Sequence, residues 1–231
     1  MCSERFNELS VLESINRALL ELGPDHRKNV KKLLNLCGEL TGAFFVIYSR
    51  SDNNQFQIIG KYTARPDLED IDFSECSICK EIINVNSDSE TVITNLQESL
   101  YAENNCFIKS CNLKTYLGKS IRSEGELLGA LCLFYDQDFV PNDDCIRVIG
   151  IIGALMGNED KRMRDHYLLE RNNHKIRALM EASSKASQVL ISNINFDDAV
   201  NQVLDIIGEA TRQDRTEHTY MNFIVTITPV Q

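Results

Sequence analysis

Two runs of apolar residues near the middle of the chain, separated by a short polar turn, predict a β-hairpin. The first run covers residues 113–122, the second covers residues 126–135, and residues 123–125 lie between them. Strand-forming runs joined by a few residues that include a glycine are typical of hairpins. Gly118 and Gly129 interrupt the two runs, which indicates a close backbone approach or a bulge at these positions.

Helical patterns flank this hairpin on both sides, because apolar residues recur there at spacings of three and four. Residues 4–22 and 26–40 are predicted to form two helices, with Asp25 as the cap of the second. A third helix is predicted to begin at Asp143 and to continue past Lys175. Acidic residues at its start complement the helix dipole.

The first and third helices each carry an apolar seam that is suited to a partner helix. In the first helix the seam consists of Leu12, Ile15, Leu19 and Leu22; in the third it consists of Val148, Ile152, Leu155, Leu169, Ile176 and Met180. In the second half of the longer seam, polar residues lie between the apolar positions, so a helix exposed to solvent is the alternative interpretation. We expect a parallel two-helix connector, and therefore a homodimer formed through the flanking helices.

The segments between the flanking helices predict the rest of a sheet and a set of short helices. Strands are expected at 43–48, 56–63 and 90–95, a short helix at 77–85, and two helical turns within 96–112. The strand patterns are continuous rather than alternating, which is typical of strands that are covered on both faces.

A stretch near the end of the chain repeats the pattern of the second helix. Residues 33–41 align with residues 203–211, including the Gly-Glu pair and the final threonine. The repeat predicts an incomplete second copy of the domain, with one further strand over 220–228. The expected organisation is an N-terminal helix (1–24), a central domain that contains the sheet (25–160), a connector helix (161–192) and a partial second domain (193–231).

The composition limits the classes of binding partner and the cellular compartment that we expect for this protein. The formal net charge of −10 argues against nucleic acid and anionic membranes, which bind basic surfaces. The sequence has no apolar run of roughly 20 residues and no signal peptide at its start. Eight cysteines without a secretory signal are expected to be reduced. We therefore expect a cytoplasmic protein without a membrane span.

The hairpin and the helix after it resemble the last part of a GAF domain, a small-molecule sensor module. The resemblance is carried by Ile121-Arg122, Gly125, the Leu-Leu-Gly-Ala-Leu sequence of residues 127–131, and residues 139–144. The amino-acid sequence of this hairpin is similar to that of GAF domains in bacterial multi-sensor histidine kinases. It implies an α+β fold with an antiparallel five- or six-stranded sheet, helices on both faces, and a ligand pocket beneath a lid.

Several large or polar-tipped side chains on predicted strands, and one cysteine at the start of the lid, are candidates for lining such a pocket. These ligand-binding candidates are Phe45, Tyr62, Cys79, Tyr116 and Cys132. Core packing is the alternative explanation for each of them.

The cysteines suggest a second kind of sensor. Four thiols at Cys76, Cys79, Cys106 and Cys111 could bind zinc or an iron–sulfur cluster, or act as redox-responsive thiols. Ordinary buried thiols are the third interpretation.

No sequence pattern supports catalysis, so the expected function is that of a ligand-sensing regulatory module rather than an enzyme. No cofactor is expected. Ligand occupancy would be transmitted through the connector helix to an output domain of a two-component or related signalling protein. An alternative is a truncated histidine kinase phosphorylated on His174, although Lys175 stands where an acidic residue is typical.

Overall fold

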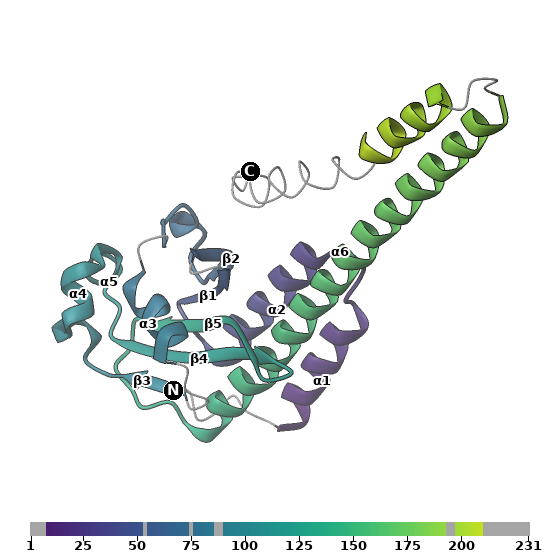
Figure 1. Cartoon of the computed structure of the whole chain (residues 1–231). Helices are drawn as coiled ribbons and strands as arrows, with labels where there is room; N and C mark the ends of the chain where they lie inside the picture. The colour runs from purple at the N-terminus through teal and green to yellow at the C-terminus, as the bar shows by residue number, and fades with distance from the viewer. Residues whose placement is uncertain (1–7, 53–54, 74–75, 86–89, 193–196, 210–231) are drawn as a thin grey trace. The chain divides into compact units, whose positions relative to one another are not determined.

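The computed structural model describes residues 8–52, 55–73, 76–85, 90–192 and 197–209. The chain divides into two compact units, residues 1–163 and residues 164–231, and the first contains the whole sheet. Figure 1 identifies the elements by label and colour.

The first unit is built on an antiparallel sheet of five strands in the order β2-β1-β5-β4-β3. The strands are β1 (Phe45–Asp52), β2 (Gln55–Thr63), β3 (Thr91–Ile93), β4 (Thr115–Ser123) and β5 (Glu126–Tyr135). The predicted hairpin is confirmed, because β4 and β5 pair along their length from Thr115↔Tyr135 to Ser123↔Glu126. Their register shifts between Ile121 and Arg122, opposite Gly129 and Leu127.

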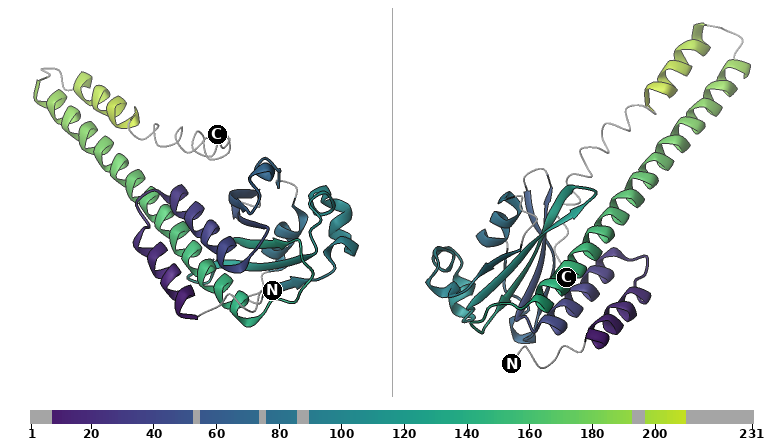
Figure 2. Two further views of the ribbon diagram at one scale, coloured as in Figure 1. Left: turned by 180° about the vertical axis from the view of Figure 1, so that it is seen from behind. Right: turned by 90° about the horizontal axis from the view of Figure 1, so that it is seen from below.

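Two helices cover one face of this sheet, α2 (His26–Thr41) and the first part of α6 (Asp143–Ser192), and α1 (Glu8–Leu20) packs against α2 (Figure 2). The side chain of Asp25 caps α2 by accepting a hydrogen bond from the amide of Lys28. Gly42 ends the helix in the left-handed conformation, with φ 67°, which glycine adopts at little cost. The sequence predicted Asp25 as the cap of this helix.

The apolar side chains between these helices and the sheet form the helix-side cluster. Its buried members are Val30, Leu33, Leu34, Cys37, Ala43, Val46, Tyr48, Leu117, Ile121, Leu128, Leu131, Leu133, Tyr135, Val148, Ile149, Ile152 and Met156. Val148 and Ile152 of the predicted α6 seam belong to it, so they face the sheet and not a partner helix.

The opposite face of the sheet is covered by short helices, which we call the lid: α3 (Ser77–Val85), α4 (Leu100–Asn104) and α5 (Cys106–Ser110) (Figure 2). Two 3₁₀ turns, η1 (Pro66–Leu68) and η2 (Leu96–Glu98), lie within the connecting segments. The predicted helix at 77–85 and the helical turns within 96–112 are thus confirmed. With α2 and α6 behind the sheet, both of its faces are covered, as its continuous strand patterns indicated.

The apolar side chains beneath the lid form the lid-side cluster. Its buried members are Phe45, Ile47, Phe73, Cys76, Ile78, Cys79, Leu96, Ala102, Phe107, Ile108, Leu113, Tyr116, Ala130, Cys132 and Phe134. Along β5 the two clusters alternate, because successive side chains of a strand point to opposite faces. Edge-to-face contacts link the aromatic rings in pairs, with centroids 4.9 Å apart for Phe73 and Phe107 and 5.1 Å apart for Tyr116 and Phe134.

The second unit contains the remainder of α6 and a helix over residues 197–209. Ala182, Ala186 and Ala199 are its buried apolar side chains among the described residues, and Leu169, Ile176 and Met180 of the predicted seam are exposed. The strand predicted over 220–228 lies outside the described residues. In the part of the chain that the structure describes, no helix is both long enough and apolar enough to cross a membrane.

Candidate functional site

The structure brings together four of the five residues predicted to line a ligand pocket. Phe45, Cys79, Tyr116 and Cys132 all belong to the lid-side cluster. Tyr62 instead packs with the helix-side cluster, where its ring covers α2: a Cβ added at Gly38 would lie 2.0 Å from its Cε1 atom. The sheet therefore separates Tyr62 from the other four.

The four lid-side residues are packed against each other and their neighbours. Cys79, Tyr116 and Cys132 are 0% exposed and Phe45 is 1% exposed. An exposed fraction of zero means that no space as large as a water molecule adjoins the side chain. A ligand at these residues therefore requires the lid or the side chains to move.

Within this cluster, Cys76 and Cys79 form a close pair at the start of α3. The amide of Lys80 donates a hydrogen bond to the carbonyl oxygen of Cys76 at 3.3 Å, which places Cys76 at the cap position of the helix. The sulfur atoms of Cys76 and Cys79 lie 2.9 Å apart, within hydrogen-bonding distance. With Cys76 as the cap, the Cys-x-x-Cys spacing puts Cys79 in the first turn, so both thiols lie at the same end of the helix.

The two thiols differ in acidity because their surroundings differ. The hydrogen bond with Cys79, the backbone N–H groups of Cys79 and Ile78, and the charge of Lys80 lower the pKa of Cys76 despite its burial. Burial raises the pKa of Cys79 well above its usual value, and hydrogen bonding with Cys132 and Cys76 adds to this. Cys76 is therefore the thiol that ionises first.

A third thiol and a phenol extend the pair across the sheet. The hydroxyl of Tyr116 donates a hydrogen bond to the sulfur of Cys132, at 3.1 Å. Cys132 also lies close enough to Cys79 to raise the pKa of its thiol. Cys76, Cys79, Cys132 and Tyr116 thus form a connected row of polarisable groups within an otherwise apolar cluster.

The four cysteines of the metal hypothesis are not gathered into one site. Cys106 is exposed and Cys111 is half-buried at the end of α5, whereas Cys76 and Cys79 are buried beneath the lid. Among the described residues, no group of three or more His, Cys, Asp or Glu side chains is arranged to hold a metal ion. None of the described cysteines forms a disulfide bond.

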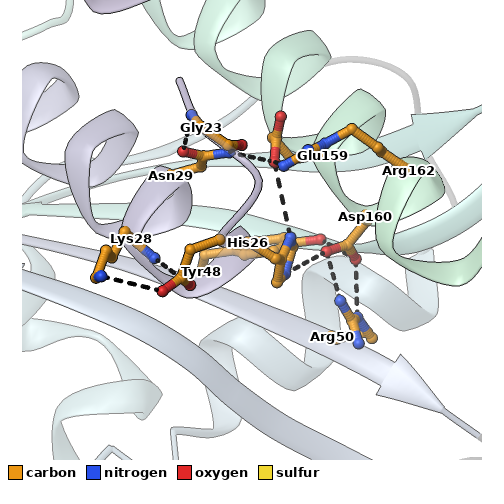
Figure 3. A network of polar contacts seen from close by, with 10 residues as sticks. Gly23, His26, Lys28, Asn29, Tyr48, Arg50, Glu159, Asp160 and Arg162 are labelled. Atoms are coloured by element: carbon orange, nitrogen blue, oxygen red, sulfur yellow. Dashed lines mark hydrogen bonds and ion pairs between the residues drawn. The ribbon is translucent and has the colours of Figure 1, made fainter. Parts of the chain in front are cut away.

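A second cluster of polar side chains lies behind the sheet, where α6 passes β1 (Figure 3). Asp160 of α6 is completely buried and accepts hydrogen bonds from both sides of the Arg50 guanidinium, including Nε to Oδ2 at 2.8 Å. The hydroxyl of Tyr48 donates to the same Oδ2 at 2.6 Å. Burial and the charge of Asp160 raise the pKa of Tyr48, so the phenol stays protonated as the donor.

Glu159 ties the same part of α6 to the connection between α1 and α2. Its Oε2 atom accepts hydrogen bonds from Asn29 Nδ2 at 2.9 Å and from Arg162 at 2.7 Å. Asn29 also holds both backbone groups of Gly23, whose amide donates to its Oδ1 at 2.9 Å and whose carbonyl oxygen accepts from its Nδ2 at 2.8 Å. One α6 turn is thus joined to α2, β1 and the α1–α2 loop.

His26 lies between the two carboxylates of this polar network. Its Nε2 atom is 3.4 Å from Asp160 Oδ1, and its Nδ1 atom is 3.9 Å from Glu159 Oε2. Burial lowers the pKa of His26, and the positive charges of Arg50 and Arg162 lower it further. The carboxylates of Asp160 and Glu159 raise it, but they do not outweigh the burial. The imidazole is therefore held neutral to lower pH than in the unfolded chain.

This environment makes stability depend on pH through His26. The unfolded imidazole binds a proton near pH 6.5, the folded one only at lower pH. Its stabilising contribution is therefore complete above pH 6.5 and is lost as the pH falls through the folded pKa. We expect the urea midpoint to fall more steeply between about pH 7 and about pH 5.5 in the wild type than in His26→Gln. The control is His166→Gln on the exposed part of α6, which should keep the wild-type slope; an equal slope in His26→Gln contradicts the assignment.

The sequence analysis did not find this network, although one signal was present. Ile149, Ile152, Met156 and Asp160 follow each other at spacings of three or four, so a carboxylate continues the buried stripe of α6. A buried carboxylate needs a partner. Its partners, Tyr48 and Arg50, lie in a distant strand that the pattern of α6 does not reveal.

Comparison with known proteins adds the likeness of the fold. No protein-family model matches the chain, and no curated protein sequence matches it. The GAF domain of a phosphoenolpyruvate–protein phosphotransferase from Coxiella burnetii is similar to it, at 12% identity and a TM-score of 0.58, covering 71% of this chain and 99% of that one. The phycoerythrobilin-bound GAF domain of a cyanobacterial phytochrome is also similar, at 12% identity and a TM-score of 0.51, covering 70% and 98%. A bacteriophytochrome from R. palustris matches at 11% identity and a TM-score of 0.58, over 88% of this chain and 46% of that one.

Proposed function

We propose that this chain, whose fold is that of a GAF domain, is a regulatory sensor module and not an enzyme. Its input site is the lid-side cluster, and its output element is α6. One observation supports this most directly: α6 packs on the sheet through Val148, Ile149 and Ile152 and is then held by Glu159 and Asp160. The same strands that carry the input site on one face therefore carry the anchored part of α6 on the other.

The sheet supplies a physical route between the two faces. In β5, Cys132 points to the lid side, and its neighbours Leu131 and Leu133 point to the helix side. In β1, Phe45 and Ile47 face the lid while Tyr48 donates its hydrogen bond to Asp160. A change in lid packing that shifts these strands therefore alters how α6 packs against the sheet, because packed cores transmit strain.

The input that we propose is a small molecule entering beneath the lid, as the phytochrome domain holds phycoerythrobilin. The residues that would contact this molecule are Phe45, Cys79, Tyr116 and Cys132. Because they are packed closely, the ligand binds by displacing α3, α4 or α5 and not by filling an empty space.

A volume-conserving pair of variants tests the location of this site. Native mass spectrometry of the purified protein identifies a co-purified small molecule, whose dissociation constant is then measured. Tyr116→Phe removes a hydroxyl from the lid side, and we expect it to weaken binding roughly threefold to tenfold, the effect of one hydrogen bond. Tyr62→Phe makes the same change on the opposite face and should bind as the wild type does. Loss of binding in Tyr62→Phe alone contradicts the lid-side assignment.

The output is proposed to operate in a homodimer formed through α1 and the exposed part of α6. Leu12 and Leu19 of α1 are 54% and 38% exposed, and Leu169, Ile176 and Met180 of α6 are 53–68% exposed. Exposed apolar seams of this kind are typical of helices that pair. Sedimentation equilibrium should find a dimer at micromolar concentration, and a monomer there contradicts the proposal.

A further inference from the structure

We propose that Cys76 and Cys79 are a redox-active dithiol, oxidised to a disulfide by hydrogen peroxide, and that this oxidation is an input of the sensor. The assignment of the pair stands on its own geometry. Its role as an input rests on the function proposed for the lid-side cluster and α6.

The geometry of the pair meets the requirements for an intramolecular disulfide. The two sulfur atoms are already 2.9 Å apart, and a bond of about 2.05 Å forms if they approach by about 0.9 Å. Cys76 is the cap of α3, a nine-residue helix, and Cys79 lies in its first turn, so little backbone has to move. Neither Cys106 nor Cys111 shares this position.

The two sulfur atoms have different roles in the reaction. The amides of Cys79 and Ile78 at the start of α3 and the charge of Lys80 lower the pKa of Cys76, which lies 2.9 Å from the sulfur of Cys79. These groups stabilise its thiolate, which is the nucleophilic form. Cys79 is fully buried and its pKa is raised, so it keeps its proton and serves as the resolving thiol.

The reaction proceeds in two balanced steps. The Cys76 thiolate attacks one oxygen of hydrogen peroxide, the O–O bond breaks, and Cys76 becomes a sulfenic acid while hydroxide leaves and takes up a proton as water. The sulfur of Cys79 then attacks the sulfur of Cys76 as its thiol proton departs. The S–O bond breaks, and the second hydroxide leaves with that proton as water. Two thiols and one peroxide give one disulfide and two waters.

Burial selects the oxidant. Cys76 is 1% exposed and Cys79 is 0% exposed, so large disulfides cannot reach them in the closed structure. Hydrogen peroxide is small and uncharged, and it reaches the pair when the start of α3 opens transiently. The third thiol, Cys132, is next to Cys79 and accepts the hydrogen bond of Tyr116, so a bond between Cys76 and Cys79 changes the contact between Cys79 and Cys132. Oxidation therefore changes the packing between the lid and β5.

The experiment uses the full chain, treated with about one equivalent of hydrogen peroxide and then alkylated and digested for peptide mapping. We expect the peptide that contains both Cys76 and Cys79 to lose two hydrogen atoms and to resist alkylation. Cys106→Ser, a matched change at an exposed thiol, should leave this product unaltered. In Cys79→Ser, the sulfenic acid at Cys76 persists and is trapped by dimedone, whereas Cys76→Ser gives neither product.

Two results overturn the inference. The first is oxidation confined to Cys106 or Cys111 in the wild type. The second is disulfide formation that is as fast in urea-unfolded protein as in folded protein, since the folded geometry would then contribute nothing. Both are measured on the wild type, so they do not depend on the folding of a variant. Amide hydrogen exchange in the first turns of α6, compared before and after oxidation, tests the proposed sensor function separately: disulfide formation without a change there leaves the dithiol established and contradicts the relay.

Discussion

Asp160→Asn is expected to lower the free energy of unfolding by about 3–5 kcal/mol, the typical effect of removing one partner of a buried ion pair. The substitution leaves Arg50 charged and 89% buried beside an amide, because only 11% of its side chain is exposed. It also weakens the acceptor of the Tyr48 hydroxyl. Since domains of this size are stable by about 5–15 kcal/mol, this is a large part of the total. Urea unfolding followed by circular dichroism measures it.

The control for this variant is Asp165→Asn, one and a half turns further along α6, where the side chain is exposed. It should change stability by no more than about 0.5 kcal/mol. The double variant Arg50→Met/Asp160→Leu removes both charges together and should be less destabilised than Asp160→Asn, because apolar residues of similar volume can replace a buried pair. A double variant as unstable as the single would show that the network does not depend on charge pairing.

Gly129→Ala is expected to be similarly damaging, for a steric reason. A Cβ at this position would lie 2.0 Å from the carbonyl oxygen of Ser49 and 3.0 Å from the Cα of Arg50, both in β1. Neither atom belongs to a side chain that can rotate away, so the paired strands β1 and β5 must separate locally. We expect a loss of about 3 kcal/mol, the upper end for overpacked sites. Thermal and urea unfolding measure it.

Gly150→Ala makes the same change where there is room. Apart from the neighbouring backbone of α6 itself, no atom lies within 4 Å of the added Cβ, and the residue is in the interior of α6. Alanine is favoured over glycine inside a helix, so this variant should be more stable by about 0.5–1 kcal/mol. Equal effects at Gly129 and Gly150 would mean that the approach of β1 to β5 does not determine the cost.

Local patterns in the sequence predicted most elements of the fold. The hairpin of β4 and β5, the cap Asp25, and α3 were each predicted from residues within a short window. The close approach indicated by Gly129 was also correct. What the sequence could not supply was the order of the strands, since β1 pairs with β5 across about 80 residues and no short-range pattern encodes that contact.

The candidate site was predicted in part for the same reason. Cys76 and Cys79 were found because their spacing is local, but their link to Cys132 depends on the packing of α3 over β5. Tyr62 was grouped with the lid-side residues because strand periodicity does not say which face a bulky residue takes. Tyr62 lies behind the sheet because it is opposite Val46 in the pairing of β2 with β1, and Val46 belongs to the helix-side cluster. The charged network was missed because its members come from four separate segments.

The two-pronged bond between Arg50 and Asp160 fixes the angular orientation of α6 about its own axis. A turn by one residue position rotates a helix by about 100°, which would carry the carboxylate out of reach of the guanidinium. Twisting or sliding of α6 at this point is therefore blocked while the bond is intact. Two motions remain: α6 can tilt about a fixed point at Asp160, or the bond between Arg50 and Asp160 can break completely. Spin labels placed on either side of residue 160 would distinguish a tilt of α6 from a rotation about its own axis.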